Sequence, residues 1–333
     1  MQTVTLGRNG PEVSVLGLGC MGMSPGIYGP SNDDESIATL RAAIDGGVTL
    51  IDTGDFYGMG HNEMLIRRAL DGVARSRFVC SVKFGALREP GGGWGGNDCR
   101  PQALKNFLAY TLRRLGADYI DIYRPARLDP AVPIEDTIGA IADMVRAGYV
   151  RHIGLSEMGA ETIRRANAVH PICDLQIEYS LMSRGIESAI LPVTRELGIS
   201  ITAYGVLSRG LLSGRVPPGE TKDDIRVVRM PRYAQGNLEK NLSLVEALGQ
   251  IGKEKGATPA QLAIAWARSR GPDIVPVIGA RRRAQLEETL GSLKLSLTAD
   301  DLARIDAAVS PTLTSGQRYD PTQMAHLDSE ARH

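Results

Sequence analysis

Hydrophobic and polar positions follow two alternating periods along this chain. Short runs rich in β-branched residues, as expected of buried strands, occupy residues 13–18, 50–51, 78–82, 118–123, 150–156, 174–179, 200–204 and 273–279. After each run the apolar positions recur at helical spacing, at residues 33–45, 62–70, 101–116, 134–148, 160–169, 187–198, 241–256 and 281–293. Eight strand–helix units in strict order are typical of a parallel sheet closed on itself. We therefore expect an α/β fold, a (β/α)8 TIM barrel.

The remaining segments predict additions to this barrel. Residues 1–12 have the pattern of an N-terminal β-hairpin that covers the open bottom. Two additional helices are expected at residues 258–271, with Thr258 as N-cap, and at residues 298–309. Residues 310–333 form an unpatterned C-terminal tail, either a lid or disordered. We expect all 333 residues to form one domain.

A doubly wound dinucleotide-binding sheet is the alternative fold. Residues 17–22, GLGCMG, contain closely spaced glycines, but they do not match G-x-G-x-x-G in register, and no helix follows directly. A doubly wound sheet also needs fewer than eight strands. The barrel is the better interpretation.

Charge and composition exclude several classes of function. The chain has 38 basic and 38 acidic residues and no net charge, so no electrostatic footprint for nucleic acid or a membrane surface is present. The N-terminal residues lack a secretory pattern, which predicts a cytoplasmic protein. The four cysteines have neither metal-ligand nor paired spacing, so we expect no metal. The expected partner is a small molecule, with a homo-oligomer possible.

Candidate chemistry lies where the predicted strands end, because the C-terminal rim of a barrel collects side chains from different strands. Asp52 ends the second strand, Tyr57 follows in its loop, and Lys83 ends the third. A nearby ammonium lowers the pKa of a phenol and so promotes proton transfer, while Asp52 would neutralise Lys83. A Schiff-base lysine would leave Tyr57 without a role. We therefore expect these three residues to be catalytic.

Six motifs in order carry a family resemblance: IDTGDFYG, SVKFG, IGLSE, LQIEYSL, AYGVLSRGLLSG and IGARRRAQLEETLG. Together they resemble the aldo-keto reductases, in particular the long-chain bacterial and plant branch, over nearly the whole length. The resemblance implies an oxidoreductase that reduces an aldehyde or ketone with NADPH, returning NADP+. Hydride would pass to the carbonyl carbon, and Tyr57 would protonate the oxygen.

The same resemblance implies a set of cofactor-binding residues. The nicotinamide would be held by Ser156, Gln176 and Tyr204, its ribose by Gly19, Met21 and Asp52, the pyrophosphate by Leu207, Ser208 and Gly210, and the adenosine end by Gly279, Arg281, Gln285 and Glu288. Gln285 and Thr289 depart from the arginine and asparagine usual in the family. Independently, three arginines, residues 281–283, begin the last helix of the barrel and suit a phosphate. A solvated basic face is the alternative.

The fourth strand departs from the family at a catalytic position. The resemblance places a histidine, the usual donor to the substrate carbonyl, where this chain has Ala126. A water or Arg124 could replace that donor, although Arg124 could equally pair with an acidic residue inside the barrel. Alternatively the reaction itself differs, with hydride reaching the β-carbon of a conjugated enone, as on a nucleotide-linked deoxysugar. A regulatory or sensor subunit that binds NADPH with little turnover is a further alternative.

Substrate walls are expected from the loops. Residues 86–101 place Trp94 among five glycines, which predicts either a mobile lid with one aromatic platform or a disordered loop. Tyr28, Ala126 and the stretch 215–236, with Tyr233, complete the expected pocket. His61, at the start of a predicted helix, is expected to cap it.

Overall fold

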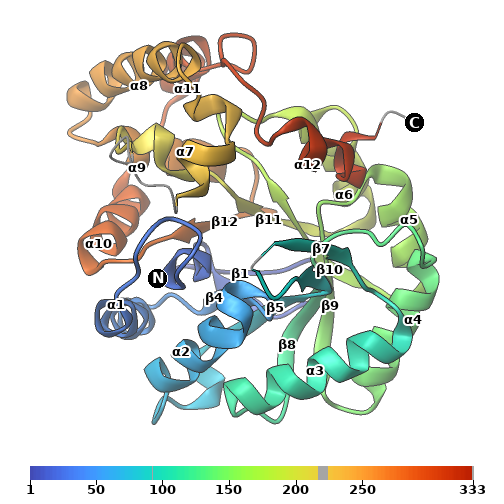
Figure 1. The fold of residues 1–333 in the computed structure, drawn as a ribbon. Helices are drawn as coiled ribbons and strands as arrows, with labels where there is room; N and C mark the ends of the chain where they lie inside the picture. Colours follow the sequence, from blue (N-terminus) through green and yellow to red (C-terminus); the bar gives the residue numbers. More distant parts are fainter. Residues whose placement is uncertain (92, 217–223, 332–333) are drawn as a thin grey trace.

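The computed structural model describes residues 1–91, 93–216 and 224–331, and its centre is a closed barrel of parallel strands (Figure 1). The strands are hydrogen-bonded in the order β3-β4-β5-β8-β9-β10-β11-β12, with β12 pairing back to β3. Their bounds are β3 Gly17–Gly19, β4 Leu50–Gly54, β5 Val79–Phe84, β8 Ile120–Pro125, β9 Val150–Ser156, β10 Ile172–Glu178, β11 Ser200–Tyr204 and β12 Ile274–Gly279. The predicted TIM barrel is confirmed.

Helices surround the barrel, and their ends carry the expected capping residues. Asn32 accepts a hydrogen bond from the backbone of Glu35 at the start of α1, and Thr258 forms a reciprocal capping box with Gln261 at the start of α9. The bounds are α1 Asp33–Asp45, α2 His61–Ala69, α3 Pro101–Leu115, α4 Ile134–Arg146, α5 Ala160–Val169, α6 Ile190–Leu197, α7 Ile225–Arg229, α8 Asn237–Glu254, α9 Pro259–Ser269, α10 Arg283–Gly291, α11 Ala299–Ala308 and α12 Pro321–Ala325. The two predicted additional helices are α9 and α11.

The N-terminal hairpin closes the bottom of the barrel, but its bounds differ from the prediction. β1 (Thr3–Thr5) pairs antiparallel with β2 (Glu12–Ser14), so residues 12–14 belong to the hairpin, and the first barrel strand begins only at Gly17. The prediction of one strand over residues 13–18 was therefore wrong. Val13 packs with Leu6 and the barrel residue Ile122, and this burial holds it in the hairpin.

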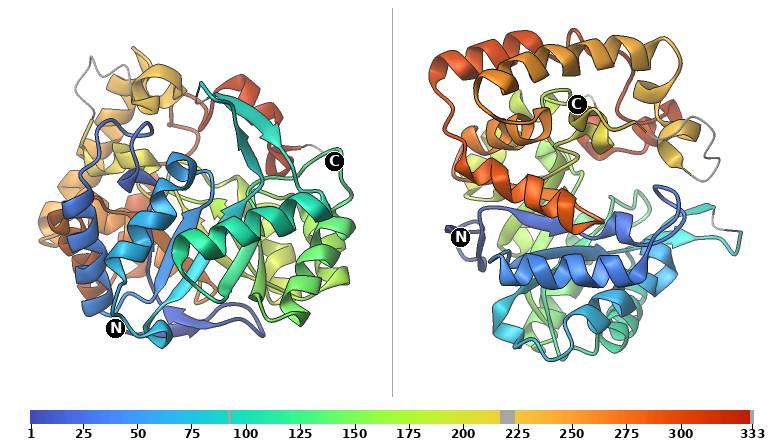
Figure 2. Two further views of the ribbon diagram at one scale, coloured as in Figure 1. Left: turned by 60° about the horizontal axis from the view of Figure 1, so that its bottom comes forward. Right: turned by 90° about the vertical axis from the view of Figure 1, so that its left-hand side faces the viewer.

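The opposite end of the barrel carries the long connections. Figure 2 shows the N-terminal hairpin at one end and the two-stranded sheet of β6 (Ala86–Arg88) and β7 (Trp94–Asn97) at the other. The glycine-rich loop is thus a β-hairpin, and the C-terminal tail forms α12 over the same end as this hairpin. The predictions for residues 86–101, 215–236 and 310–333 include residues 92, 217–223 and 332–333, which lie outside the described residues.

Within the part of the chain that is described, no helix has the length and apolar character needed to cross a bilayer. The same residues hold no cluster of three or more His, Cys, Asp or Glu side chains placed to bind a metal ion.

Candidate active site

A cavity of about 290 Å³ opens where the barrel strands end, and the sequence-predicted residues surround it. Its lining includes Gly19, Met21, Tyr28, Asp52, Tyr57, Lys83, Trp94, Ala126, Ser156, Gln176, Tyr204, Leu207, Gly210, Gly279, Arg281, Gln285 and Glu288. Arg124, Ser208 and Tyr233 are predicted site residues that do not line it. Side chains more than 200 residues apart in the sequence therefore meet at one site.

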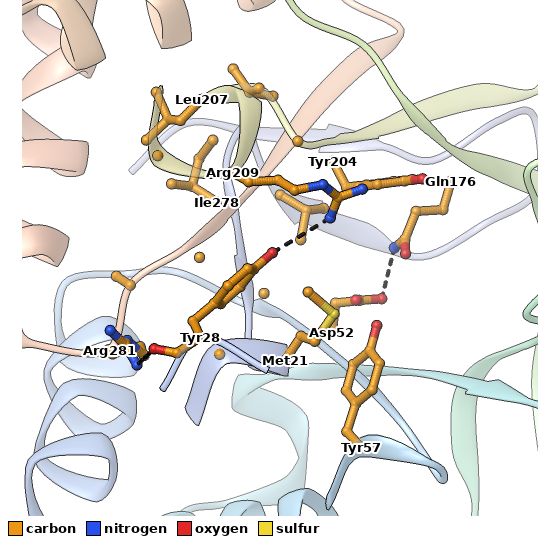
Figure 3. A pocket seen from close by; sticks show the side chains of 18 of the residues that line it. Met21, Tyr28, Asp52, Tyr57, Gln176, Tyr204, Leu207, Arg209, Ile278 and Arg281 are labelled. Atoms are coloured by element: carbon orange, nitrogen blue, oxygen red, sulfur yellow. Dashed lines mark hydrogen bonds between the residues drawn. The ribbon is translucent and has the colours of Figure 1, made fainter. Parts of the chain in front are cut away.

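Asp52, Lys83 and Gln176 form a buried hydrogen-bonded group, here called the strand-end cluster. Lys83 Nζ donates to Asp52 Oδ1 and, over 2.8 Å, to Gln176 Oε1. Gln176 Nε2 donates over 2.7 Å to Asp52 Oδ2 (Figure 3). The Lys83 and Asp52 side chains are only 5% and 6% exposed, so each charge depends on the other for compensation.

Tyr57 lies beside this cluster, in the turn that follows β4, and its hydroxyl points toward the Asp52 carboxylate (Figure 3). Lys83 Nζ lies 5.3 Å from the centre of its ring. Burial raises the pKa of Tyr57 well above its ordinary value, the Asp52 charge raises it further, and Arg127 opposes the rise. The expectation that Lys83 makes the phenol more acidic stays a prediction, since the ammonium is paired with Asp52 in this state. Tyr57 thus holds its proton at neutral pH.

Arg124 does not reach the cavity. Its side chain is fully buried inside the barrel, where Nη1 lies 2.9 Å from Asp174 Oδ2 and Nη2 donates over 2.8 Å to Ser81 Oγ. The structural alternative for Arg124, a pair with a buried carboxylate, is therefore correct, and its proposed catalytic role is wrong. Residues alternate in direction along a strand, and the next arginine, Arg127, lies past the end of β8 and lines the cavity instead.

Ser156, at the end of β9, is the clearest sign of an external ligand. Its hydroxyl oxygen is buried against the cavity and has no hydrogen-bond partner among the described residues. An unpaired buried hydroxyl costs free energy that a bound polar group would recover. The amide of Gln176 lines the same part of the barrel mouth, since the register of β9 and β10 places Ser156 beside Gln176.

The loop after β11 has an unusual backbone. Ser208 and Arg209 adopt left-handed conformations with φ of 46° and 58°, and Gly210 follows with φ of 100°. Such strain is retained mainly at functional sites. The Ser208 side chain points away from the cavity, because its Oγ accepts a hydrogen bond from Arg232 over 2.9 Å. If Ser208 contacts a ligand, it does so through its backbone.

Tyr28 lies between two arginines at the far part of the cavity. Arg281 Nη1 donates to the Tyr28 carbonyl oxygen over 2.9 Å, and Arg209 Nη1 donates to its hydroxyl over 3.5 Å (Figure 3). Of the arginine cluster at α10, Arg283 turns away to pair with Glu35 on the surface, so only Arg281 lines the cavity. The predicted three-arginine site thus reduces to one residue.

Two further predictions were wrong. Tyr233 is buried beside the loop after β11 and donates over 3.0 Å to the Arg209 carbonyl oxygen, so it supports that loop rather than forming a cavity wall. His61 does not cap α2. The helix starts at His61 itself, after Gly60. The His61 side chain instead contacts two other residues, with Nδ1 3.0 Å from Ser24 Oγ and Nε2 3.2 Å from Asp33.

Comparison with known proteins decides the family. A sequence model described as the aldo/keto reductase family matches residues 15–310. The chain belongs to this family. It is 38% identical to a probable aldo-keto reductase of Glycine max, over 96% of this chain and 92% of that protein.

Solved structures agree with this membership of the aldo/keto reductases. The glycerol dehydrogenase of Gluconobacter oxydans superposes with a TM-score of 0.81 at 28% identity, covering 92% of this chain and 94% of its own. An aldo-keto reductase of Bacillus halodurans in its holo form superposes with a TM-score of 0.78 at 26% identity, covering 93% and 97%. The similarity therefore extends over the whole barrel.

The C-terminal tail of this aldo/keto reductase completes the cavity with residues that sequence reasoning missed. Arg318 holds Glu157 with two hydrogen bonds of 2.9 and 2.6 Å, and the Tyr319 hydroxyl lies 2.9 Å from that of Tyr204. Tyr204 in turn donates to Glu157 over 2.6 Å. We call these four residues the mouth network. Nothing in the tail's sequence pattern indicated it, because the tail docks through individual polar contacts, such as those of Arg318 and Ser329 with Glu157, rather than through a periodic apolar face.

Other cavity residues were also missed or undervalued. Phe56 packs edge-on against Tyr57 with ring centres 4.8 Å apart, and Arg127 and Arg209 bring charge to the wall. Trp94, on β7, is 44% exposed, and the Arg88 guanidinium carbon lies 5.9 Å from its ring centre. Arg127 follows Ala126 directly at a strand end, and the sequence already offered it, with Arg88 and Arg124, as a residue that could accept an acidic substrate.

Proposed function

We propose that this aldo/keto reductase uses NADPH to reduce the carbonyl group of a small aldehyde or ketone. The observation that carries the proposal is Tyr57, a protonated phenol in a cavity wall, beside the buried strand-end cluster. A proton donor in the wall of a cavity is what protonation of a bound carbonyl oxygen requires.

The residues present fit the nicotinamide cofactor. The unpartnered Ser156 hydroxyl and the Gln176 amide suit a carboxamide, and the ring of Tyr204 offers a stacking surface. Leu207 and Gly210 would face the pyrophosphate. Arg281, Gln285 and Glu288 would take the adenosine end. When bound, NADPH supplies the hydride that the carbonyl carbon accepts.

The protein's own step is proton transfer. Tyr57 donates its phenolic proton to the carbonyl oxygen as the carbon is reduced, so the product is an alcohol and the residue is left as a phenolate. Lys83 lies close enough to stabilise that phenolate, and Asp52 and Gln176 hold the ammonium in place. Burial keeps the phenol protonated between turnovers.

Reduction of a conjugated C=C bond is the second candidate, and Ala126 favours it. This residue is 2% exposed and lines the cavity at the position where the family resemblance places a histidine. A methyl group there leaves room for a substrate to sit deeper and offers the carbonyl oxygen no hydrogen bond. The added space favours hydride transfer to the β-carbon of an enone, because a deeper substrate presents that carbon to the cofactor.

The test measures NADPH oxidation with uncharged aldehydes and with conjugated enones, and identifies the products. Tyr57→Phe should lower kcat by roughly 10² to 10⁴ while NADPH binding is unchanged. Ala126→His should raise aldehyde turnover by roughly 10², if the missing donor limits carbonyl reduction. Binding of NADPH without multiple turnover on any substrate would contradict an enzymatic role and favour a sensor.

A further inference from the structure

Arg127 is the unusual charge in the cavity wall. The other arginines of the wall are engaged: Arg209 lies 3.4 Å from Glu178, Arg215 pairs with Glu288, Arg226 pairs with Asp224, and Arg281 donates to two backbone carbonyls. Arg127 forms no ion pair with any described carboxylate. Its hydrogen bonds run from Nη1 to the Ala126 carbonyl oxygen over 2.6 Å, and from Nη2 to the Tyr319 hydroxyl over 3.5 Å.

The nearest acidic group is already satisfied. Glu157 contributes to the electrostatic environment of Arg127, but Arg318 binds both of its carboxylate oxygens and Tyr204 donates to one of them. Asp52, the remaining acid in the cavity wall near Tyr57, is neutralised by Lys83. The cavity around Arg127 thus has one positive charge in excess, partly removed from water, and such a charge favours an anionic partner.

Arg127 lies close to the reacting end of the cavity. It directly follows Ala126 past the end of β8, and both residues line the cavity together with Tyr57. The neighbouring walls are aromatic, formed by Phe56, Trp94 and Tyr319. Arg88 adds positive potential behind them, 5.9 Å from the ring centres of both Phe56 and Trp94, and it has no ion pair among the described residues. A guanidinium beside an aromatic slot suits a planar anion such as a carboxylate.

We propose that the substrate is an aldehyde or ketone that also carries a carboxylate, and that Arg127 binds this carboxylate while the carbonyl lies at Tyr57. The planar guanidinium presents parallel N–H donors that match a carboxylate. This inference rests on the proposed carbonyl reduction and names its substrate class. Arg127 then determines specificity, and it does not take part in proton transfer.

The test compares para-carboxybenzaldehyde with its uncharged methyl ester as substrates of the full-length protein with NADPH. The wild type should show a KM for the acid that is roughly 10- to 100-fold below that for the ester, the value of a charge-assisted pair. Arg127→Met should abolish this preference by raising the KM for the acid, so that the acid and the ester have similar KM values. Arg127→Lys, which keeps the positive charge but lacks the parallel N–H donors of the guanidinium, should retain part of the preference for the acid.

Controls separate this inference from the proposed function. Arg113→Met removes an exposed arginine on α3 and should change the KM for neither substrate. Quenching of tryptophan fluorescence by benzoate, compared with benzamide, reports anion binding without turnover, and circular dichroism checks the fold of each variant. If Arg127→Met does not fold, Arg127→Lys and benzoate binding still test the proposal.

Several outcomes would overturn it. Equal KM values for the acid and the ester in the wild type would do so. Equal losses of kcat/KM for both substrates in Arg127→Met would also do so, because they would indicate a role on the carbonyl itself. Preference for an aldehyde bearing a phosphate group would overturn the choice of a carboxylate. If neither aldehyde oxidises NADPH but benzoate binds through Arg127, the proposed reduction fails while the anion site stands.

Discussion

The strand-end cluster and the mouth network are two buried charge groups around one cavity, but they are assembled differently. Asp52, Lys83 and Gln176 all belong to barrel strands, and β4 and β5 are direct neighbours. The mouth network joins Glu157 to Arg318, which lies 161 residues later in the tail beyond the barrel. The first group is a consequence of closing the barrel, whereas the second requires a separate docking event. Disturbing the first should therefore affect chemistry, and disturbing the second should affect stability.

The largest effect is expected from the strand-end cluster. Lys83→Met should lower turnover by roughly 10² to 10⁴, because the phenolate of Tyr57 loses its nearby cation. It should also destabilise the fold, since Asp52 is left as a buried, uncompensated carboxylate. The double variant Asp52→Asn, Lys83→Met should recover stability in urea unfolding but not turnover. Recovery of both would show that the cluster is only structural.

The mouth network should give a smaller effect, mainly on stability. Arg318→Met leaves Glu157 buried without its cation, which should cost about 3 kcal/mol and expose the tail to proteolysis. Burial alone would raise the pKa of Glu157, but Arg318 holds it below its ordinary value, so this stabilisation is present at neutral pH and lost only in acid. Arg304→Met, which breaks an exposed pair with Glu254, is the matched control and should cost less than about 1 kcal/mol. Equal losses of unfolding free energy in Arg318→Met and Arg304→Met would contradict this difference between the buried and the exposed ion pair.

The free energy of unfolding should depend on pH through Asp55, which follows β4 next to the strand-end cluster. Burial, with the Glu63 charge, raises the pKa of Asp55 from 3.8 to about 8. Between these values the unfolded chain binds fewer protons than the folded one, so stability falls as the pH rises. Asp55→Asn should remove this slope and should be more stable than the wild type near pH 8. The same dependence of unfolding free energy on pH in the wild type and in Asp55→Asn, measured by urea unfolding, would contradict this prediction.

The smallest expected effects come from a matched pair of serines at the cavity. Ser156→Ala removes a hydroxyl without a protein partner, so it should raise the Kd for NADPH about 2- to 10-fold with little change in stability. Ser208→Ala removes the acceptor of Arg232 and should lower stability by about 1 kcal/mol with NADPH affinity nearly unchanged. Fluorescence titration and urea unfolding measure both quantities. A reversed pattern would place the cofactor elsewhere.

Sequence patterns predicted the barrel and the residues at its strand ends, because each strand ends at the same rim and contributes side chains at known positions. Asp52, Lys83, Ser156 and Gln176 line the cavity for this reason. The errors concern side chains whose direction depends on neighbours. Arg124 turned inward to Asp174, and the Val13 region paired as a hairpin rather than entering the barrel.

The sequence by itself determined the closed barrel, its family and the meeting of Asp52 with Lys83, since periodic burial and strand order leave few ways to arrange eight parallel strands. Only the tertiary structure decided how the charges pair across the cavity: Arg318 with Glu157, Arg209 with Glu178, and Arg127 with no carboxylate among the described residues. The physical reason is that a buried charge takes whichever partner lies within a few ångströms. That proximity arises from packing and has no signature in local sequence.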